Sequence, residues 1–208
     1  MTAIYLDHNA TTPLLPEVLE EIAIRLAALQ NTQQPSADRA HIAIFAADHG
    51  VAVEGVSAFP QSVTVEMIRN FARGGAAINV LARTLDASLE IINLGTAYEI
   101  QTLANVRYFR LGPGTANFVH EPAMTWEQLS QALVIGYETI ERAQKDGQQI
   151  FIGGEMGIGN TTSATALACL LLHEQPALLT GRGTGLDAAG VTHKVAIIKR
   201  AVALHRPQ

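Results

Sequence analysis

Continuous apolar runs alternate with amphipathic segments along this chain of 208 residues. Residues 41–47, 88–95 and 150–152 are β-favouring runs that stop at glycine or polar residues, which is typical of strands buried on both faces. Apolar residues at helical spacing, helix caps or both predict helices over residues 16–30, 62–70, 76–85, 125–145, from about 160, and 188–205. Because strands alternate with helices, we expect a Rossmann-like, doubly wound α/β fold with a mainly parallel sheet and helices on both faces.

Smaller elements complete the expected fold. Residues 108–111 have strand character, and residues 177–180 are predicted as a short strand that leads into a glycine-rich loop. Thr125 and Gln128 have the spacing of a capping box, so a helix should begin there. Lys194 is expected on the exposed side of the last helix.

Composition excludes several classes of protein. The 48% of hydrophobic residues can build a full core for one domain, and the net charge of −5 argues against general nucleic-acid binding. The single cysteine, Cys169, lies in an apolar stretch, so no disulfide framework is possible and a reducing compartment is indicated. No apolar run is long enough to span a bilayer. We therefore expect a cytoplasmic protein that binds neither nucleic acid nor membrane.

A strand, a glycine-rich turn and a helix are predicted within residues 148–172. Such a turn points backbone N–H groups at whatever lies above it, and the helix N-terminus adds partial positive charge, so the expected ligand is a phosphate or carboxylate. Gly154, Gly159 and Thr161 fit the P-loop spacing, but Asn160 replaces the lysine. Without that lysine a monophosphate ester is favoured over a triphosphate. A plain tight turn is the alternative interpretation.

Two other polar residues stand where ligands bind in open α/β sheets. Glu155 places a carboxylate inside the anion-binding loop, which is electrostatically awkward and therefore indicates a functional residue. His49 follows the strand 41–47, at the expected carboxyl edge of the sheet. It fits a ligand contact and a histidine bonded within a turn equally well. No second histidine or carboxylate stands at ligand spacing from His49, so we expect no metal, and no other cofactor is indicated.

Six short segments together resemble one enzyme family. They are Phe-Ala-Ala-Asp-His-Gly-Val (45–51), Glu-Gly-Val-Ser (54–57), Arg-Gly-Gly-Ala-Ala-Ile-Asn (73–79), Gly-Thr-Ala-Asn (114–117), Gly-Glu-Met-Gly-Ile-Gly-Asn-Thr-Thr-Ser (154–163) and Gly-Arg-Gly-Thr-Gly-Leu-Asp (181–187). In order and spacing they resemble the nicotinate-nucleotide–dimethylbenzimidazole phosphoribosyltransferases, over residues 20–205.

The resemblance implies a reaction and a site. A benzimidazole nitrogen would attack the anomeric carbon of nicotinate mononucleotide, nicotinate would leave, and α-ribazole phosphate would form for the lower ligand of cobalamin. This chemistry needs a phosphate cradle, an apolar slot for a flat base and a carboxylate that accepts a proton. The residues that the resemblance assigns are Gly157, Gly159, Asn160, Thr161 and Lys194 for the phosphate and Ser57, Phe59, Glu66 and Met67 for the base. Glu155, by its place in the loop, is the expected catalytic carboxylate. It also implies a homodimer.

The chain departs from this family at both ends. Residues 4–13 resemble the amino-terminal signature of the cysteine desulfurases, which use pyridoxal phosphate, but nothing later resembles that family's cofactor lysine or catalytic cysteine loop. We expect residues 1–19 to be an atypical extension without desulfurase chemistry, and residues 20–208 to be a phosphoribosyltransferase-like domain. Family members continue beyond the equivalent of Gln208 and carry their usual general base there. The domain is therefore expected to be incomplete, and the alternative function is a truncated, non-catalytic nucleotide-binding or interaction protein.

Overall fold

The computed structural model describes residues 15–206, and the chain divides into two compact units, Met1–Ala37 and Asp38–Gln208. In the first unit, helix α1 (Pro16–Gln30) begins with a proline, whose fixed φ suits the first turn. It ends where Asn31 takes the left-handed conformation. The desulfurase-like signature at residues 4–13 lies outside the described residues, and the boundary at residue 19 stays a prediction.

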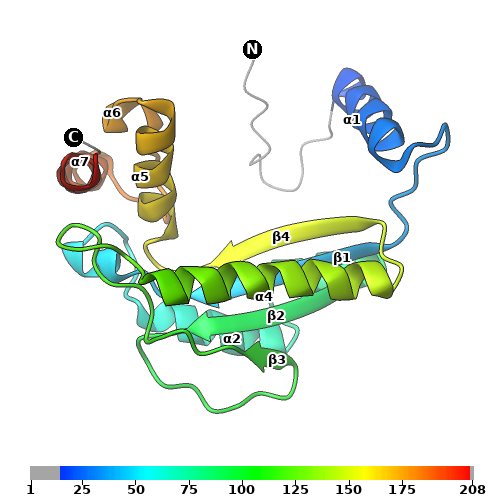
Figure 1. Ribbon diagram of the computed structural model, residues 1–208, viewed down its shortest axis with the longest axis horizontal. Helices are drawn as coiled ribbons and strands as arrows, with labels where there is room; N and C mark the ends of the chain where they lie inside the picture. Colours follow the sequence, from blue (N-terminus) through cyan, green and yellow to red (C-terminus); the bar gives the residue numbers. More distant parts are fainter. Residues whose placement is uncertain (1–14, 207–208) are drawn as a thin grey trace. The chain divides into compact units, whose positions relative to one another are not determined.

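The second unit contains a parallel sheet, as the alternating pattern predicted (Figure 1). Its described strands are β1 (Ala40–Ala47), β2 (Ser88–Gly95), β3 (Val106–Tyr108) and β4 (Ile150–Met156), in the order β3-β2-β1-β4. Every neighbouring pair in this order is parallel. The most buried residues of the sheet lie in β1 and β2, which have neighbours on both sides. This position explains why their sequences read as continuous apolar runs.

Helices cover both faces of the sheet, which confirms the doubly wound α/β class. Ile44 of β1 packs in a cluster with residues of α2 (Ser62–Ala72) and α3 (Ala77–Thr84). Ala43, its neighbour in sequence, packs with Ile135 of α4 (Trp126–Lys145), because successive side chains in a strand point to opposite faces. Figure 1 shows α4 crossing one face of the sheet and α2 on the other.

A third apolar cluster lies outside the sheet. Beyond the carboxyl end of β4 the chain forms α5 (Asn160–Leu172), α6 (Pro176–Leu179) and α7 (Ala188–His205) (Figure 1). Cys169 of α5 and Ile198 of α7 are fully buried in this cluster, together with Val51 of the short 3-10 helix η1 (Gly50–Glu54). The cysteine thus packs as a small hydrophobic residue. The cluster packs the loop after β1 and helix α5 against α7.

Two local predictions have different outcomes. The capping box is confirmed, because the Gln128 N–H donates to Thr125 Oγ1 at 3.2 Å and the Thr125 N–H donates to Gln128 Oε1 at 2.9 Å. The strand predicted at residues 177–180 is wrong, because this segment forms α6. Pro176 occupies the first turn of α6 and favours a helical start, and the Thr180 hydroxyl donates back to the Pro176 carbonyl at 2.6 Å. The apolar pair Leu178 and Leu179 alone did not distinguish helix from strand.

Two glycines with opposite surroundings give a paired test of this fold. Gly95 has φ +139°, and a Cβ placed on it would lie 2.0 Å from the Gly112 carbonyl oxygen, whereas a Cβ on Gly136 of α4 meets nothing within 4 Å. Gly95→Ala should therefore lower the free energy of unfolding by more than about 2 kcal/mol. Gly136→Ala should raise it by about 0.5–1 kcal/mol through helix propensity. Urea unfolding followed by circular dichroism measures both, and equal effects would contradict the register at the end of β2.

Candidate functional site

The carboxyl edge of the sheet gathers the loops that follow neighbouring strands. β1 and β4 are paired in register, with Phe45 opposite Glu155 and Ala46 opposite Met156. The chain leaves β1 through Asp48 and His49, and it leaves β4 through the glycine-rich turn. Residues that are more than a hundred positions apart in sequence therefore meet at this edge, as the ends of adjacent parallel strands should.

A cavity of about 260 Å³ lies at this edge and brings together much of the predicted site. The predicted residues that line it are Ser57, Glu155, Gly157, Gly159, Asn160 and Thr161. Gly183 and Thr184 close the cavity from the loop before α7. The hydroxyls of Ser57 and Thr184 lie 3.0 Å apart and tie two walls of the cavity together.

Close backbone approach explains the glycines of the turn. A Cβ on Gly157 would lie 2.2 Å from the Ala47 carbonyl oxygen and 2.8 Å from His49 Cδ2. Gly159 caps α5 with φ +97°, a conformation that suits glycine, and a Cβ there would lie 3.1 Å from His49 Cβ. Asn160 and Thr161 follow in the first turn of α5, so the helix N-terminus faces the cavity. This arrangement favours an anion.

Lys194 lies beneath the cavity and is fully buried, so its predicted place on the exposed side of the last helix is wrong. Its ammonium donates to Thr161 Oγ1 at 2.6 Å and lies 3.5 Å from the Gly181 carbonyl oxygen. Among residues 15–206 it has no carboxylate partner. Burial lowers the pKa of this lysine below its ordinary value of 10.5. The site therefore contains a desolvated cation without an acidic partner in the described part of the chain.

His49 and Glu155 form a pair beside the cavity. His49 Nε2 lies 3.3 Å from Glu155 Oε1, and His49 Nδ1 lies 2.9 Å from Ser163 Oγ. Both ring nitrogens are thus held, while the Glu155 side chain keeps 36% of its surface exposed. Sequence reasoning left His49 open between a ligand contact and a turn histidine. In the structure its ring contacts the carboxylate that lines the cavity.

The other residues predicted for the base slot lie elsewhere. Phe59 is 51% exposed, and its N–H donates to Ser57 Oγ at 3.2 Å. Glu66 is exposed on α2 and forms an ion pair with Arg69, one turn away. Met67 packs against the apolar cluster between the sheet and α2. None of Phe59, Glu66 and Met67 lines the described cavity, so their role in base binding stays a prediction.

Five lining residues were absent from the predicted site: Val56, Met156, Ile158, Gly183 and Thr184. Thr184 accepts a hydrogen bond from the Ala58 N–H and contacts the Ser57 hydroxyl, and Gly183 passes over Thr161 and Lys194. Met156 supplies an apolar wall. All five lie in segments that the family resemblance had already marked. Only the fold, which brings residue 184 against residue 57, shows that they share one cavity.

Comparisons with known proteins found similar chains. A family model described as phosphoribosyltransferase matches residues 17–208. Two proteins named nicotinate-nucleotide–dimethylbenzimidazole phosphoribosyltransferase are similar over 187 residues, or 90% of this chain. One, from Pseudomonas aeruginosa (strain LESB58), is 59% identical, and the match covers 53% of it. The other, from Xanthomonas oryzae pv. oryzae (strain PXO99A), is 57% identical, and the match covers 54% of it.

A solved structure is also similar. The crystal structure of CobT from Thermus thermophilus superposes with a TM-score of 0.85 at 43% sequence identity. The match covers 95% of this chain and 60% of that chain. The chain thus spans about half the length of the curated relatives that it matches.

The buried ammonium generates a stability prediction. Lys194→Met keeps the length of the side chain and removes a buried charge that has no counter-ion, so it should raise the free energy of unfolding by about 1 kcal/mol or more. Lys199→Met, on the exposed side of the same helix, should change it by less than about 0.5 kcal/mol. Urea unfolding at pH 7, in buffer without phosphate or nucleotide, measures both. A Lys194→Met chain that is clearly less stable than the original would contradict an uncompensated charge.

The pH dependence of the free energy of unfolding gives a second test of the buried lysine. Because the pKa of Lys194 is lower in the folded than in the unfolded chain, the unfolded chain binds more protons between the two values. The stability contributed by this group therefore rises as pH increases through the lowered pKa towards 10.5. Lys194→Met should lack this rise, which unfolding curves in steps of pH would show.

Proposed function

This chain belongs to the nicotinate-nucleotide–dimethylbenzimidazole phosphoribosyltransferase family, and we propose that it performs the transfer for which its relatives are named. The donor is nicotinate mononucleotide. The acceptor is dimethylbenzimidazole or a related base, and the product is α-ribazole phosphate for the lower ligand of cobalamin. The predicted domain, residues 20–208, lies within the segment that matches the family model.

One observation carries this proposal: the fully buried ammonium of Lys194 beneath a glycine-lined cavity. A phosphate monoester at the N-terminus of α5 would supply the missing counter-charge through Thr161. It would also accept hydrogen bonds from the backbone of the turn. The cavity of about 260 Å³ suits a phosphate and part of a sugar better than a triphosphate. Anchoring the phosphate there fixes the ribose near the end of β4.

Glu155 is the proposed general base. In the transfer, the azole nitrogen forms a bond to the anomeric carbon, and the bond to nicotinate breaks with its electron pair on the nicotinate nitrogen. The proton of the other acceptor nitrogen then passes to a carboxylate. Glu155 lines the cavity, and His49, itself bonded to Ser163, holds its carboxylate in place. General-base catalysis of this kind contributes roughly 10²–10⁴-fold to the rate.

Binding and turnover experiments test the proposal together. Calorimetry should show that nicotinate mononucleotide binds the full chain and that Lys194→Met weakens this binding by at least about tenfold, since it removes the positive charge that acts on the phosphate through Thr161. Glu155→Gln keeps shape and hydrogen bonding but loses the base. It should retain nucleotide affinity within about tenfold, or about 1.4 kcal/mol, and abolish transfer to dimethylbenzimidazole.

The controls separate the roles within the site. Lys199→Met should bind and react as the original chain does. Full transfer activity in Glu155→Gln would exclude Glu155 as the base. Tight nucleotide binding without any turnover by the original chain would support the alternative function, a non-catalytic nucleotide-binding protein, over the transferase.

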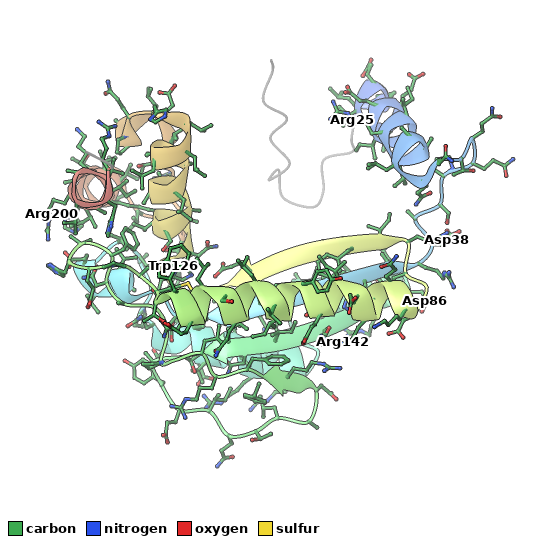
Figure 2. The ribbon with its side chains drawn as sticks, in the orientation of Figure 1. Arg25, Asp38, Asp86, Trp126, Arg142 and Arg200 are labelled. Atoms are coloured by element: carbon green, nitrogen blue, oxygen red, sulfur yellow. The ribbon has the colours of Figure 1, made fainter. Side chains whose placement is uncertain are left out.

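We also propose a homodimer. Among the described strands, β4 has no neighbour on its outer side, and Ile152 in this strand is 45% exposed. Apolar residues of α4 are exposed as well, among them Trp126 at its start (Figure 2). An open strand edge beside an apolar surface favours association. Light scattering at micromolar concentration should give twice the mass of the chain, and a monomer would contradict the proposal.

A cytoplasmic location is part of the same proposal. Its support is the single cysteine, which is buried and free. Within residues 15–206, no helix is long and apolar enough to cross a membrane.

A further inference from the structure

A second cavity lies at the opposite edge of the sheet, where β1, β2 and β3 begin. We call it the amino-edge cavity. It has a volume of about 710 Å³, and its charged lining residues are His41, Arg73, Arg83, Glu90, Arg107, Arg142 and Asp146. At 3.3 Å per residue, β1 separates it from the glycine-lined cavity by roughly 25 Å. It is therefore not part of the candidate active site.

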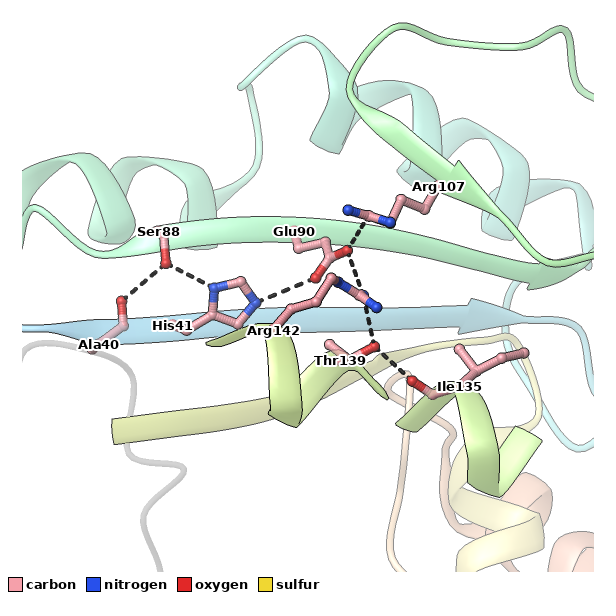
Figure 3. A network of polar contacts seen from close by, with 8 residues as sticks. All are labelled: Ala40, His41, Ser88, Glu90, Arg107, Ile135, Thr139 and Arg142. Carbon is pink, nitrogen blue, oxygen red and sulfur yellow. Dashed lines mark hydrogen bonds and ion pairs between the residues drawn. The ribbon is translucent and has the colours of Figure 1, made fainter. Parts of the chain in front are cut away.

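Glu90 is the centre of an ion-pair network in this cavity (Figure 3). Arg107 Nε lies 2.5 Å and Arg142 Nη2 lies 3.0 Å from Glu90 Oε1, and His41 Nε2 lies 3.3 Å from Glu90 Oε2. His41 Nδ1 is in turn 2.8 Å from Ser88 Oγ. This network joins β1, β2, β3 and α4. Because three cationic or potentially cationic groups already surround Glu90, it has no capacity to neutralise further arginines.

The other two arginines of the cavity, Arg73 and Arg83, are not part of this network. The Arg83 guanidinium donates to the Gly74 carbonyl at 3.0 Å, and it has no carboxylate partner among residues 15–206. Across the same residues, the Arg73 side chain forms no hydrogen bond and no ion pair. Gly74 follows Arg73 directly, so the structure brings the two guanidinium-bearing segments together at the C-terminal end of α2.

The cavity is positively charged although the chain is acidic. Its four arginines and two carboxylates give a local charge of +4 − 2 = +2 with neutral His41, in a chain whose net charge is −5. The lining also includes three buried apolar residues, Phe71, Ile91 and Val106. Guanidinium groups bind phosphate through two parallel hydrogen bonds, and apolar side chains in the lining can contact an organic group.

We propose that the amino-edge cavity is a second ligand site, which binds a small phosphorylated molecule through Arg73 and Arg83. The phosphate group pairs with these two exposed guanidinium groups, and the organic part lies within the cavity, where apolar residues form part of the lining. The Glu90 network has a separate, structural role, because it fixes β3 and α4 to the sheet. Loss of Arg73 and Arg83 should therefore leave the fold intact, whereas loss of Glu90 would not.

Calorimetry with inorganic pyrophosphate tests the site, and the Lys194→Met chain is the background in which to do it. That substitution removes the cation of the glycine-lined cavity and weakens anion binding there, so the arginine substitutions report on the amino-edge cavity. Pyrophosphate should bind Lys194→Met, and adding Arg73→Gln and Arg83→Gln should weaken that binding by at least about tenfold. The matched control adds Arg25→Gln and Arg200→Gln, which remove the same charge from two ion-paired surface arginines and should change the affinity by less than about threefold.

Two results would overturn the proposal. One is the absence of pyrophosphate binding to Lys194→Met, with nucleotide binding to the original chain intact. The other is an equal loss of affinity in the cavity variant and in the control, which would mean that only the net charge matters. Urea unfolding of each variant shows whether the fold is retained. If Arg73→Gln and Arg83→Gln together destabilise the chain, the two single variants replace the double variant. Each of them should still weaken pyrophosphate binding. Because the readout is independent of transfer activity, failure here leaves the proposed function untouched.

Discussion

The carboxyl edge of this sheet depends on one interaction, the contact between the buried ammonium of Lys194 and the hydroxyl of Thr161. A buried charge with only a hydroxyl and a carbonyl for partners costs free energy in the empty chain. The apolar packing of α7 against α5 offsets that cost, since Ile197, Ile198 and Ala201 follow Lys194 at helical spacing and are buried. The ammonium is therefore held in position before any ligand arrives. A bound anion would therefore meet a positive charge that is already in place, without any rearrangement of the lysine side chain.

Steric exclusion provides the other half of the site. β1 and β4 are adjacent and parallel, so the residue after each strand must pass close to the other strand's turn. His49 occupies that space, and Gly157 and Gly159 leave room for it. A side chain at either glycine would displace the ring that holds Glu155. The glycines therefore have two roles. They leave the backbone of the cradle accessible, and they leave room for the ring that contacts the partly exposed carboxylate of Glu155.

Much of this arrangement could be predicted from the sequence, for reasons that differ between residues. The apolar runs of β1 and β2 and the cap at Thr125 depend on neighbours in sequence, so local pattern predicted them. The glycine-rich turn was assigned to the site through its own residue types and the family resemblance. Lys194 was placed on the wrong side of its helix, although positions 194, 197, 198 and 201 form one helical stripe that the apolar residues mark as buried. The charge of the lysine concealed that pattern.

Other features depend on contacts across the fold and left no local signal. Thr184 reaches Ser57 only because the loop before α7 folds over the end of β4.

The two edges of the sheet carry cations of different kind, and this difference has a physical consequence. Lys194 is a single, desolvated point charge beneath a rigid turn, so it favours an anion at one fixed position and is little screened by salt. Arg73 and Arg83 lie at an exposed rim, where hydration and salt weaken each contact. Binding at the amino edge should therefore fall steeply with ionic strength, while binding at the carboxyl edge should fall much less. Since β1 runs from one edge to the other, the same strand positions both sites, but no charge is shared between them.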